Sequence, residues 1–162
     1  MKRARTSSPR NPSARSPRLV AMDALARREH SRYELMSRLS ERFDLDREEL
    51  ELVLDELEQD GLLSDRRFAE SFVRYRAGRG QGRVRIRYDL RARGVGDELV
   101  SSALQSEGVD WFALAADVLV RRFGPAAPDN YSERAKRMRF LQQRGFSGDE
   151  IQAALESLGE EG

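Results

Sequence analysis

Cysteine is absent from this chain of 162 residues, and histidine occurs once, at His30. Without cysteine the chain can form no disulfide, thiolate nucleophile or sulfur-ligated metal site, and its absence fits a reducing compartment. A lone histidine excludes the histidine pair of the familiar zinc sites. Long apolar runs are also missing, since no stretch approaches the roughly 18 residues of a membrane span and no secretory signal is recognisable. We therefore expect a cytoplasmic protein with no metal and no membrane contact.

Recognisable catalytic and cofactor-binding signatures are missing as well. His30 has no nucleophile or orienting partner at a telling spacing, so a surface or capping role near a helix end is the stronger interpretation. The glycine-rich stretch at 78–82 lacks the Gly-Lys-Ser/Thr ending of a phosphate loop, which favours a flexible link between two helices. The acidic residues at 46–51 suit the start of a helix and need no metal to explain them. We expect no enzyme activity, no cofactor and no small-molecule substrate.

Charge is plentiful but unevenly placed. The chain has 29 basic and 28 acidic residues, yet residues 65–93 hold ten arginines against Asp65, Glu70 and Asp89, a net charge of +7. The segments on either side are slightly or strongly acidic. Such polarity favours association with a polyanion or with an acidic protein surface.

An internal repeat with an offset of 51 residues organises the rest of the chain. Leu90-Arg-Ala-Arg-Gly94-Val95 matches Leu141-Gln-Gln-Arg-Gly145-Phe146, and a fainter copy lies about 50 residues upstream. Helical spacing continues through each copy, and a further amphipathic segment precedes each one, at 18–29, 66–78 and 111–123. Two capping boxes are expected, at Asp46-x-x-Glu49 and Ser147-x-x-Glu150. Since no run alternates with period two, the chain is predicted to be all-α.

The predicted architecture is three tandem three-helix repeats forming an elongated curved body. A disordered basic N-terminal arm at 1–17 precedes a first repeat at 18–64, a basic second repeat at 65–108 and a third repeat at 109–162. Because each unit is small, we expect the units to stack end to end and to share apolar faces. The residues expected to be mainly buried are Phe68, Phe72, Leu90, Val100, Leu104, Leu114, Leu119, Leu141, Phe146, Ile151 and Leu155.

The candidate partner-binding residues are the arginines of the second repeat, among which Tyr75 and Tyr88 are interspersed. They are Arg66, Arg67, Arg74, Arg76, Arg79, Arg83, Arg85, Arg87, Arg91 and Arg93. Arg83, Arg87 and Arg91 recur every fourth residue and share a helix face, whereas Ile86 and Leu90 point toward a core. Guanidinium groups can bind phosphates or carboxylates, so DNA and an acidic protein groove both remain possible targets. A solvated face without a partner is disfavoured because few acids lie nearby in the chain.

At these residues the sequence resembles the RecX family of bacterial regulatory proteins, over about residues 18–158. Four ordered motifs carry the resemblance: Ala26-Arg-Arg-Glu-His30-Ser-Arg-x-Glu34-Leu35, Gly61-Leu-Leu-Ser-Asp65-x-Arg67-Phe68-Ala69, Gly80-x-Gly82-x-x-Arg85-Ile86-x-x-x-Leu90, and Arg139-Phe-Leu-x-x-Arg144-Gly145-Phe146. One departure is Arg83, where relatives often carry proline. The N-terminal arm lies outside the shared pattern.

The resemblance implies a protein that lies in the groove of a RecA recombinase filament on single-stranded DNA. We expect it to be a monomer, although the sequence does not show the oligomeric state. Such binding would hinder ATP hydrolysis, strand exchange and co-protease action, and would modulate recombination and the SOS response, while the protein itself hydrolyses nothing. Whether it caps, disassembles or only occupies the filament stays open. The alternative is a repeat protein whose primary ligand is single- or double-stranded DNA itself, which would lose affinity steeply with salt.

Overall fold

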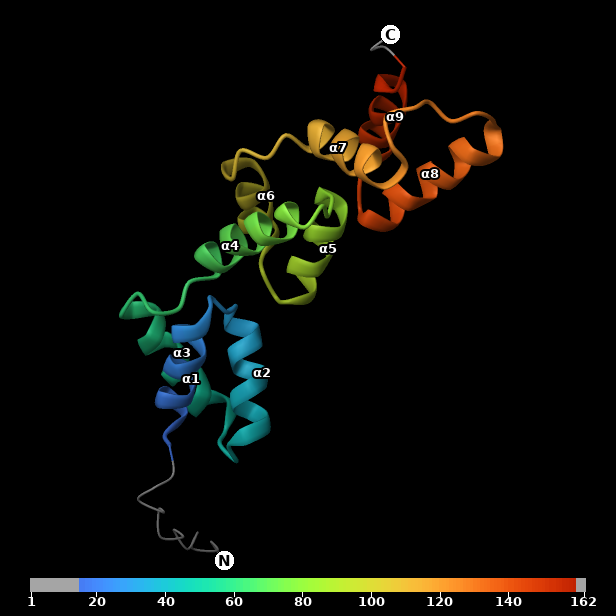
Figure 1. Ribbon diagram of the computed structural model, residues 1–162. Helices are drawn as coiled ribbons and strands as arrows, with labels where there is room; N and C mark the ends of the chain where they lie inside the picture. Colours follow the sequence, from blue (N-terminus) through green and yellow to red (C-terminus); the bar gives the residue numbers. More distant parts are fainter. Residues whose placement is uncertain (1–14, 160–162) are drawn as a thin grey trace, which may run out of the picture.

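A computed structural model describes residues 15–159, which form nine helices and no strand (Figure 1). This confirms the all-α prediction. The helices are α1 (Pro17–Arg27), α2 (Arg32–Arg42), α3 (Arg47–Gln59), α4 (Asp65–Gly78), α5 (Arg83–Ala92), α6 (Asp97–Ser106), α7 (Trp111–Phe123), α8 (Tyr131–Arg144) and α9 (Gly148–Ser157). Most of the arm expected at 1–17 lies outside the described residues, and Pro17 is the first residue of α1.

Local sequence explains where most of these helices start. Six of them begin after a serine, aspartate or asparagine whose side chain accepts a hydrogen bond from the first turn: Ser16, Ser31, Ser64, Asp110, Asn130 and Ser147. The capping box at Ser147 and Glu150 is confirmed. The box expected at Asp46 is wrong, because Asp46 precedes α3 without a side-chain hydrogen bond to it. Its carboxylate can therefore act only through its charge on the helix dipole.

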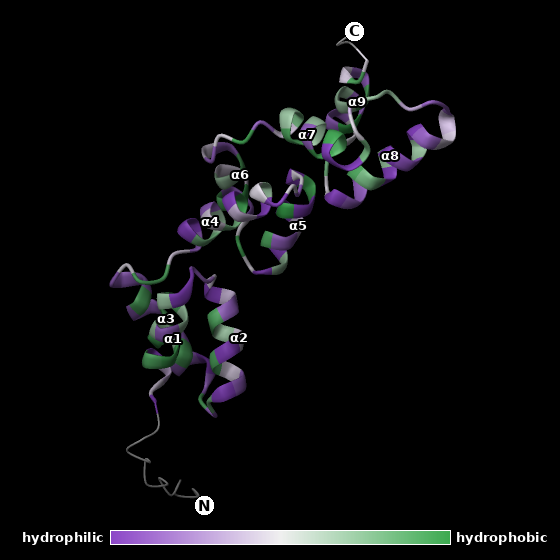
Figure 2. Ribbon diagram, in the orientation of Figure 1, coloured by the Kyte–Doolittle hydropathy of each residue, from purple (hydrophilic) through white to green (hydrophobic). Residues whose placement is uncertain are grey.

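The helices pack in threes, and each set encloses an apolar cluster of its own (Figures 1 and 2). We call α1–α3, α4–α6 and α7–α9 the first, second and third repeats. The repeats follow one another along an elongated, bent body, as the repeat pattern predicts (Figure 1). Nine of the eleven residues expected to be buried are buried, and Phe72 and Leu114 are partly buried.

The expectation that neighbouring repeats stack by sharing their apolar faces is wrong. Each repeat buries eight to ten apolar residues within its own three helices, so little apolar surface is left for its neighbour. Among the described residues, only Val109, just before α7, and Trp111 and Leu114, at its start, pack against the core of the preceding repeat, and Leu114 also contacts the core of its own repeat. The repeats must therefore be joined mainly by polar and backbone contacts.

Those contacts join the middle helices of successive repeats. At the first joint the N-terminus of α2 meets the C-terminal end of α5, where the Ser31 hydroxyl donates to the Arg93 carbonyl at 2.8 Å. At the second joint the N-terminus of α5 meets the end of α8, where the Gly82 N–H donates to the Arg144 carbonyl at 2.8 Å. Ser31 and Gly82 are 51 residues apart, as are Arg93 and Arg144, so one geometry recurs. The positive end of each helix dipole faces the negative end of the next, which stabilises both joints.

The second joint requires glycine on both sides. The N–H groups of Val84 and Arg85 donate to the Gly145 carbonyl at 2.9 and 3.4 Å, which brings the two backbones into contact. A Cβ atom on Gly82 would lie 2.4 Å from the Gly145 carbonyl oxygen, and Gly145 has a left-handed φ of 93°. The link predicted between two helices is thus present at 79–82, and its last residue is anchored to the third repeat.

Candidate functional site

The ten candidate arginines lie on α4, on α5 and just after each of these helices. Several have acidic partners from other parts of the chain. Arg67 pairs with Glu29 at 3.0 Å, and Arg74 pairs with Glu107 at 3.0 Å. The expectation that few acids lie near this block is therefore wrong, because it counted neighbours along the chain and these partners are more than 30 residues away.

Arg83 pairs with the most deeply buried carboxylate of the described residues. Its Nε donates to Glu150 Oε2 at 2.7 Å, and the Glu150 side chain is fully buried. The other Glu150 oxygen accepts the Ser147 N–H at 3.0 Å within the capping box of α9. Arg83 thus neutralises a buried carboxylate across the second joint. This contact gives Arg83 a structural role in addition to any role in binding a partner.

The remaining arginines of the row on α5 are also partnered. Arg87 donates to the Ser101 hydroxyl at 3.3 Å, and Arg91 pairs with Asp97 at 2.7 Å on the surface. Arg85 pairs with Asp89 at 3.3 Å. The surface ion pairs of Arg85 and Arg91 contribute little to stability and exchange readily with solvent, and half-exposed Arg87 makes only one long hydrogen bond, so these side chains remain available to a partner.

A basic and aromatic cluster lies where the second repeat meets the first. The guanidinium groups of Arg76 and Arg93 lie 4.6 and 4.9 Å from the centre of the Phe72 ring. Both also donate hydrogen bonds to Asp89. Arg76 donates to the Asp89 carboxylate at 3.4 Å, and Arg93 donates to the Asp89 backbone carbonyl at 3.0 Å. Such stacking holds two positive charges in fixed positions on one ring.

This cluster forms one wall of a groove of about 460 Å³, which we call the joint groove. Arg28, Glu29 and Glu34 of the first repeat line its other side. Its charge is mixed, so it does not select strongly for anions. Tyr75 lies at its edge with an exposed fraction of 60%, and the Arg79 guanidinium lies 5.4 Å from the Tyr75 ring centre.

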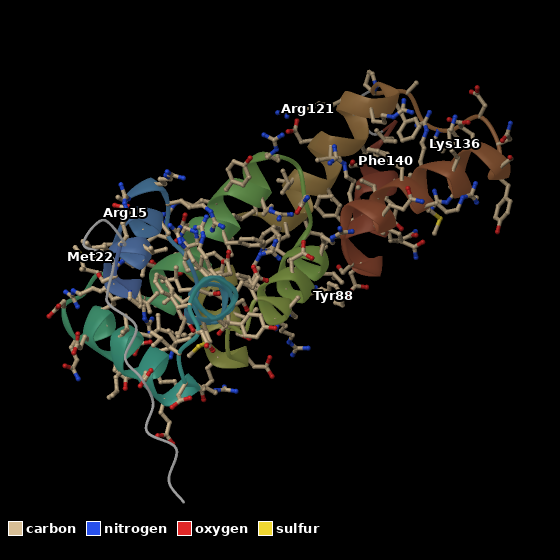
Figure 3. All side chains as sticks on the ribbon, turned by 90° about the horizontal axis from the view of Figure 1, so that it is seen from below. Arg15, Met22, Tyr88, Arg121, Lys136 and Phe140 are labelled. Carbon is tan, nitrogen blue, oxygen red and sulfur yellow. The ribbon has the colours of Figure 1, made fainter. Side chains whose placement is uncertain are left out.

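Arg79 also borders a second groove, of about 440 Å³, between the turn after α4 and helices α7 and α8. We call it the arginine groove. Its lining includes Arg79, Val118, Arg121, Arg122, Phe140 and Arg144, and no acidic residue. Arg121 on α7 and Phe140 on α8 are labelled in Figure 3. The stacked pair of Tyr75 and Arg79 thus lies between the joint groove and the arginine groove, which is lined by the second and third repeats.

Sequence reasoning missed the part of this groove that lies in the third repeat. Residues 94–162 are acidic overall, with 7 basic against 12 acidic residues, so charge counting pointed elsewhere. The available signal was the pair of adjacent arginines at 121 and 122, together with Arg144 at the end of a helix. Only the packing of α7 beside α8 brings these three guanidinium groups to one groove.

Two titratable groups lie at the first joint. His30 is buried, with its Nδ1–H donating to the Arg28 carbonyl at 3.0 Å, so the surface interpretation of His30 is wrong. Burial lowers the pKa of His30, and the positive charge of Arg28 lowers it further. Burial likewise raises the pKa of Asp65, although a hydrogen bond from the Arg32 N–H at 2.8 Å opposes the shift. Neither side chain has the partners of a catalytic dyad.

Within residues 15–159, no cluster of three or more histidine, aspartate or glutamate side chains could hold a metal ion. None of the helices described there has the length and hydropathy needed to cross a bilayer.

Two segments match models of known domains. Residues 64–104 match the second three-helix domain of RecX, and residues 109–155 match the third. The matched segments closely follow the second and third repeats.

Whole-chain comparisons agree with these matches. The regulatory protein RecX of Chromohalobacter salexigens is 48% identical over 140 residues, which cover 86% of this chain and 91% of that protein. The RecX of Halorhodospira halophila is 44% identical over 142 residues, covering 88% of each. The crystal structure of RecX from Lactobacillus salivarius superposes with a TM-score of 0.71 at 24% identity, covering 88% of this chain and 94% of that one.

Proposed function

The chain belongs to the RecX family of regulatory proteins, and from this premise we propose that it binds the RecA filament on single-stranded DNA and restrains it. Bound in this way, it would lower ATP hydrolysis, strand exchange and co-protease action, and so modulate recombination and the SOS response. The protein acts as a monomer and contributes no chemistry of its own.

The observation that carries this proposal is the serial joining of three repeats through their middle helices. A body built in this way presents a long surface that can contact neighbouring subunits of a long polymer. Several weak contacts on one connected body add up to a strong overall affinity, because the later contacts form at a high effective concentration. A compact enzyme would instead close around a small pocket.

Inhibition follows from bridging. Subunits of an ATP-hydrolysing filament must change their relative positions during turnover, and a ligand shifts such an equilibrium by its preference for one state. A body that bridges subunits favours the arrangement it fits and slows the rest of the cycle. The second repeat supplies the contacts in this proposal, through the ten candidate arginines, and those with exposed side chains are the readiest to bind.

The test is RecA ATP hydrolysis on single-stranded DNA, measured with increasing amounts of the full chain. Inhibition is expected, and inhibition well below one molecule per recombinase subunit would favour capping or disassembly over occupation of the groove. Undiminished hydrolysis at an excess of the protein would contradict the proposal.

A pair of variants locates the contact. Arg66 and Arg87 have no carboxylate partner among residues 15–159, so Arg66→Glu/Arg87→Glu reverses charge without disturbing an ion pair. We expect this variant to need at least about 10-fold more protein for the same inhibition, because attraction to an acidic surface becomes repulsion. Arg38→Glu/Arg42→Glu is the matched control, because both side chains are exposed on the first repeat and neither has a carboxylate partner among residues 15–159. Equal losses in both would remove the second repeat as the contact.

Direct binding to DNA is a second candidate, favoured by the arginine groove and its lack of acidic lining residues. The two functions differ in their dependence on salt. Phosphate-dominated binding to bare DNA loses affinity steeply as salt rises, whereas docking on a filament requires the recombinase and retains more affinity.

A further inference from the structure

We propose that the arginine groove binds the phosphodiester backbone of single-stranded nucleic acid directly, independently of any recombinase. The biological setting rests on the proposed function, since a filament formed on single-stranded DNA brings such a strand to the protein. The binding itself does not, and it can be measured with the protein alone.

Uncompensated charge is the first argument. Four arginines from three separate elements meet at the groove: Arg79 after α4, Arg121 and Arg122 on α7, and Arg144 on α8. Only Arg121 has a carboxylate partner among the described residues, Asp117 at 2.9 Å, and that pair is exposed to solvent. Three guanidinium groups that repel one another without an acid between them form a site that an anion stabilises.

The second argument is that aromatic rings, rather than acids, hold these charges in place. The Arg122 guanidinium lies 5.1 Å from the centre of the Phe123 ring, and the Arg144 guanidinium lies 5.7 Å from that of Phe140. The two rings support each other in an edge-to-face pair with centres 5.3 Å apart. Stacking leaves the N–H edges of both guanidinium groups free, and a pre-positioned side chain loses less conformational entropy when it binds.

The chemistry of these groups favours phosphate. Guanidinium groups match the geometry of a phosphate with two parallel hydrogen bonds, and they remain charged at any physiological pH. Arginines alternating with aromatic side chains along a basic groove are typical of proteins that bind single strands. Tyr75 lines the joint groove, but it is exposed and stacks with Arg79 of the arginine groove, so it offers a nearby face on which a base can stack.

The size and position of the groove favour a single strand over a duplex. The groove of about 440 Å³ lies between the Gly78–Gly80 turn of the second repeat and the side chains of Val118 and Phe140 in the third. A single backbone can enter a space of this size, whereas a duplex would contact only its rim. The Arg144 carbonyl also accepts the Gly82 N–H, so a strand bound here contacts both sides of the second joint.

The experiment measures binding of a fluorescent oligothymidylate of about 20 nucleotides to the full chain by anisotropy, over a range of salt. Arg79→Ala/Arg122→Ala removes two exposed groove arginines that have no acidic partner, so the fold is preserved, as circular dichroism can verify. We expect the dissociation constant to rise about 10-fold or more, and the slope of log K against log salt to shrink by about 1.4, at about 0.7 per lost phosphate contact.

Arg38→Ala/Arg42→Ala removes the same charge from exposed positions of the first repeat that also have no acidic partner among residues 15–159, and it should leave both quantities nearly unchanged. Equal losses in the two double variants would overturn the site, since binding would then follow net charge alone. Equally tight binding of a duplex of the same length would overturn the preference for single strands. Displacement of the oligonucleotide by poly-glutamate at the same charge concentration would identify an acidic protein segment as the ligand instead.

These outcomes are independent of RecA inhibition. A folded groove variant that loses oligonucleotide binding but still inhibits the recombinase supports the site and leaves the proposed function intact. Oligonucleotide binding that is unaffected by the groove variant overturns the site, whatever the recombinase assay gives.

Discussion

At the first joint, α2 reaches the end of α5 through the Ser31 hydroxyl, whereas at the second joint α5 reaches the end of α8 through its own backbone. Both joints place the N-terminus of a middle helix on the carbonyl end of the next middle helix. Serine at one N-cap and glycine at the other account for the difference, because only glycine lets the two backbones touch. The same fold is thus assembled once with a side-chain contact and once with a backbone contact.

The flanking contacts widen this difference. The second joint adds the apolar contacts of Trp111 and Leu114 and a buried carboxylate, Glu150, neutralised by Arg83. The first joint adds the partly exposed pair of Arg67 with Glu29 and a hydrogen bond from the Arg32 N–H to Asp65. We therefore expect the second and third repeats to behave as one unit, with the first repeat attached more loosely.

The largest effect is expected from filling the glycine contact at the second joint. In Gly82→Ala the added methyl group would lie 2.4 Å from the Gly145 carbonyl oxygen, although the φ of Gly82 is an ordinary −83°. Overpacking and the loss of backbone hydrogen bonds should lower the free energy of unfolding by about 3 kcal/mol, measured by urea denaturation.

Gly96→Ala is the matched control for that substitution. Gly96 is also a helix N-cap with an ordinary φ, and a methyl group there would meet nothing within 4 Å. It should lower the free energy of unfolding by about 1 kcal/mol or less. Equal losses in the two variants would show that the second joint adapts to a methyl group, and the comparison of the joints would fail.

A smaller effect separates the ion pairs of the two joints. Arg83→Ala leaves the fully buried Glu150 carboxylate without its cation, and we expect a loss of about 2 kcal/mol. This is below the cost for a fully buried pair, because the Arg83 side chain is 41% exposed. Arg67→Ala breaks the exposed pair with Glu29 and should cost less than about 1 kcal/mol. Similar losses of the free energy of unfolding in the two variants would show that the two ion pairs contribute equally to stability, against this prediction.

The 51-residue repeat predicted the second and third repeats well, including the buried positions Leu90 and Leu141, because helical periodicity specifies which face of a helix is apolar. It could not say what that face packs against, so the expected sharing of apolar faces was wrong. The contacts between successive repeats could not be predicted from the sequence either. Arg83 and Glu150 are 67 residues apart, and nothing local marks them as a pair.

The smallest expected effect is a pH dependence confined to the first joint. His30 is the only histidine, and burial lowers its pKa below 6.5 in the folded protein. Near pH 6.5 the unfolded chain therefore binds a proton on His30 that the folded chain does not yet bind. The free energy of unfolding falls as the pH drops from 6.5 to the folded pKa, and below that pKa it no longer changes. The slope cannot exceed about 1.4 kcal/mol per pH unit for one proton. The raised pKa of Asp65 acts in the opposite direction, because the folded state binds that proton first.

Two probes can assign this loss to one joint. Trp111 is the only tryptophan and packs at the second joint, so its emission reports on that joint, whereas circular dichroism reports on all the helices. Between about pH 7.5 and 5.5, the urea transition seen by circular dichroism should move to lower urea while the Trp111 transition stays in place. His30→Gln, which cannot titrate, should abolish that shift. If both probes moved together in the wild-type protein, the first repeat would be coupled to the others as firmly as they are to each other, and the difference between the joints would have no energetic consequence.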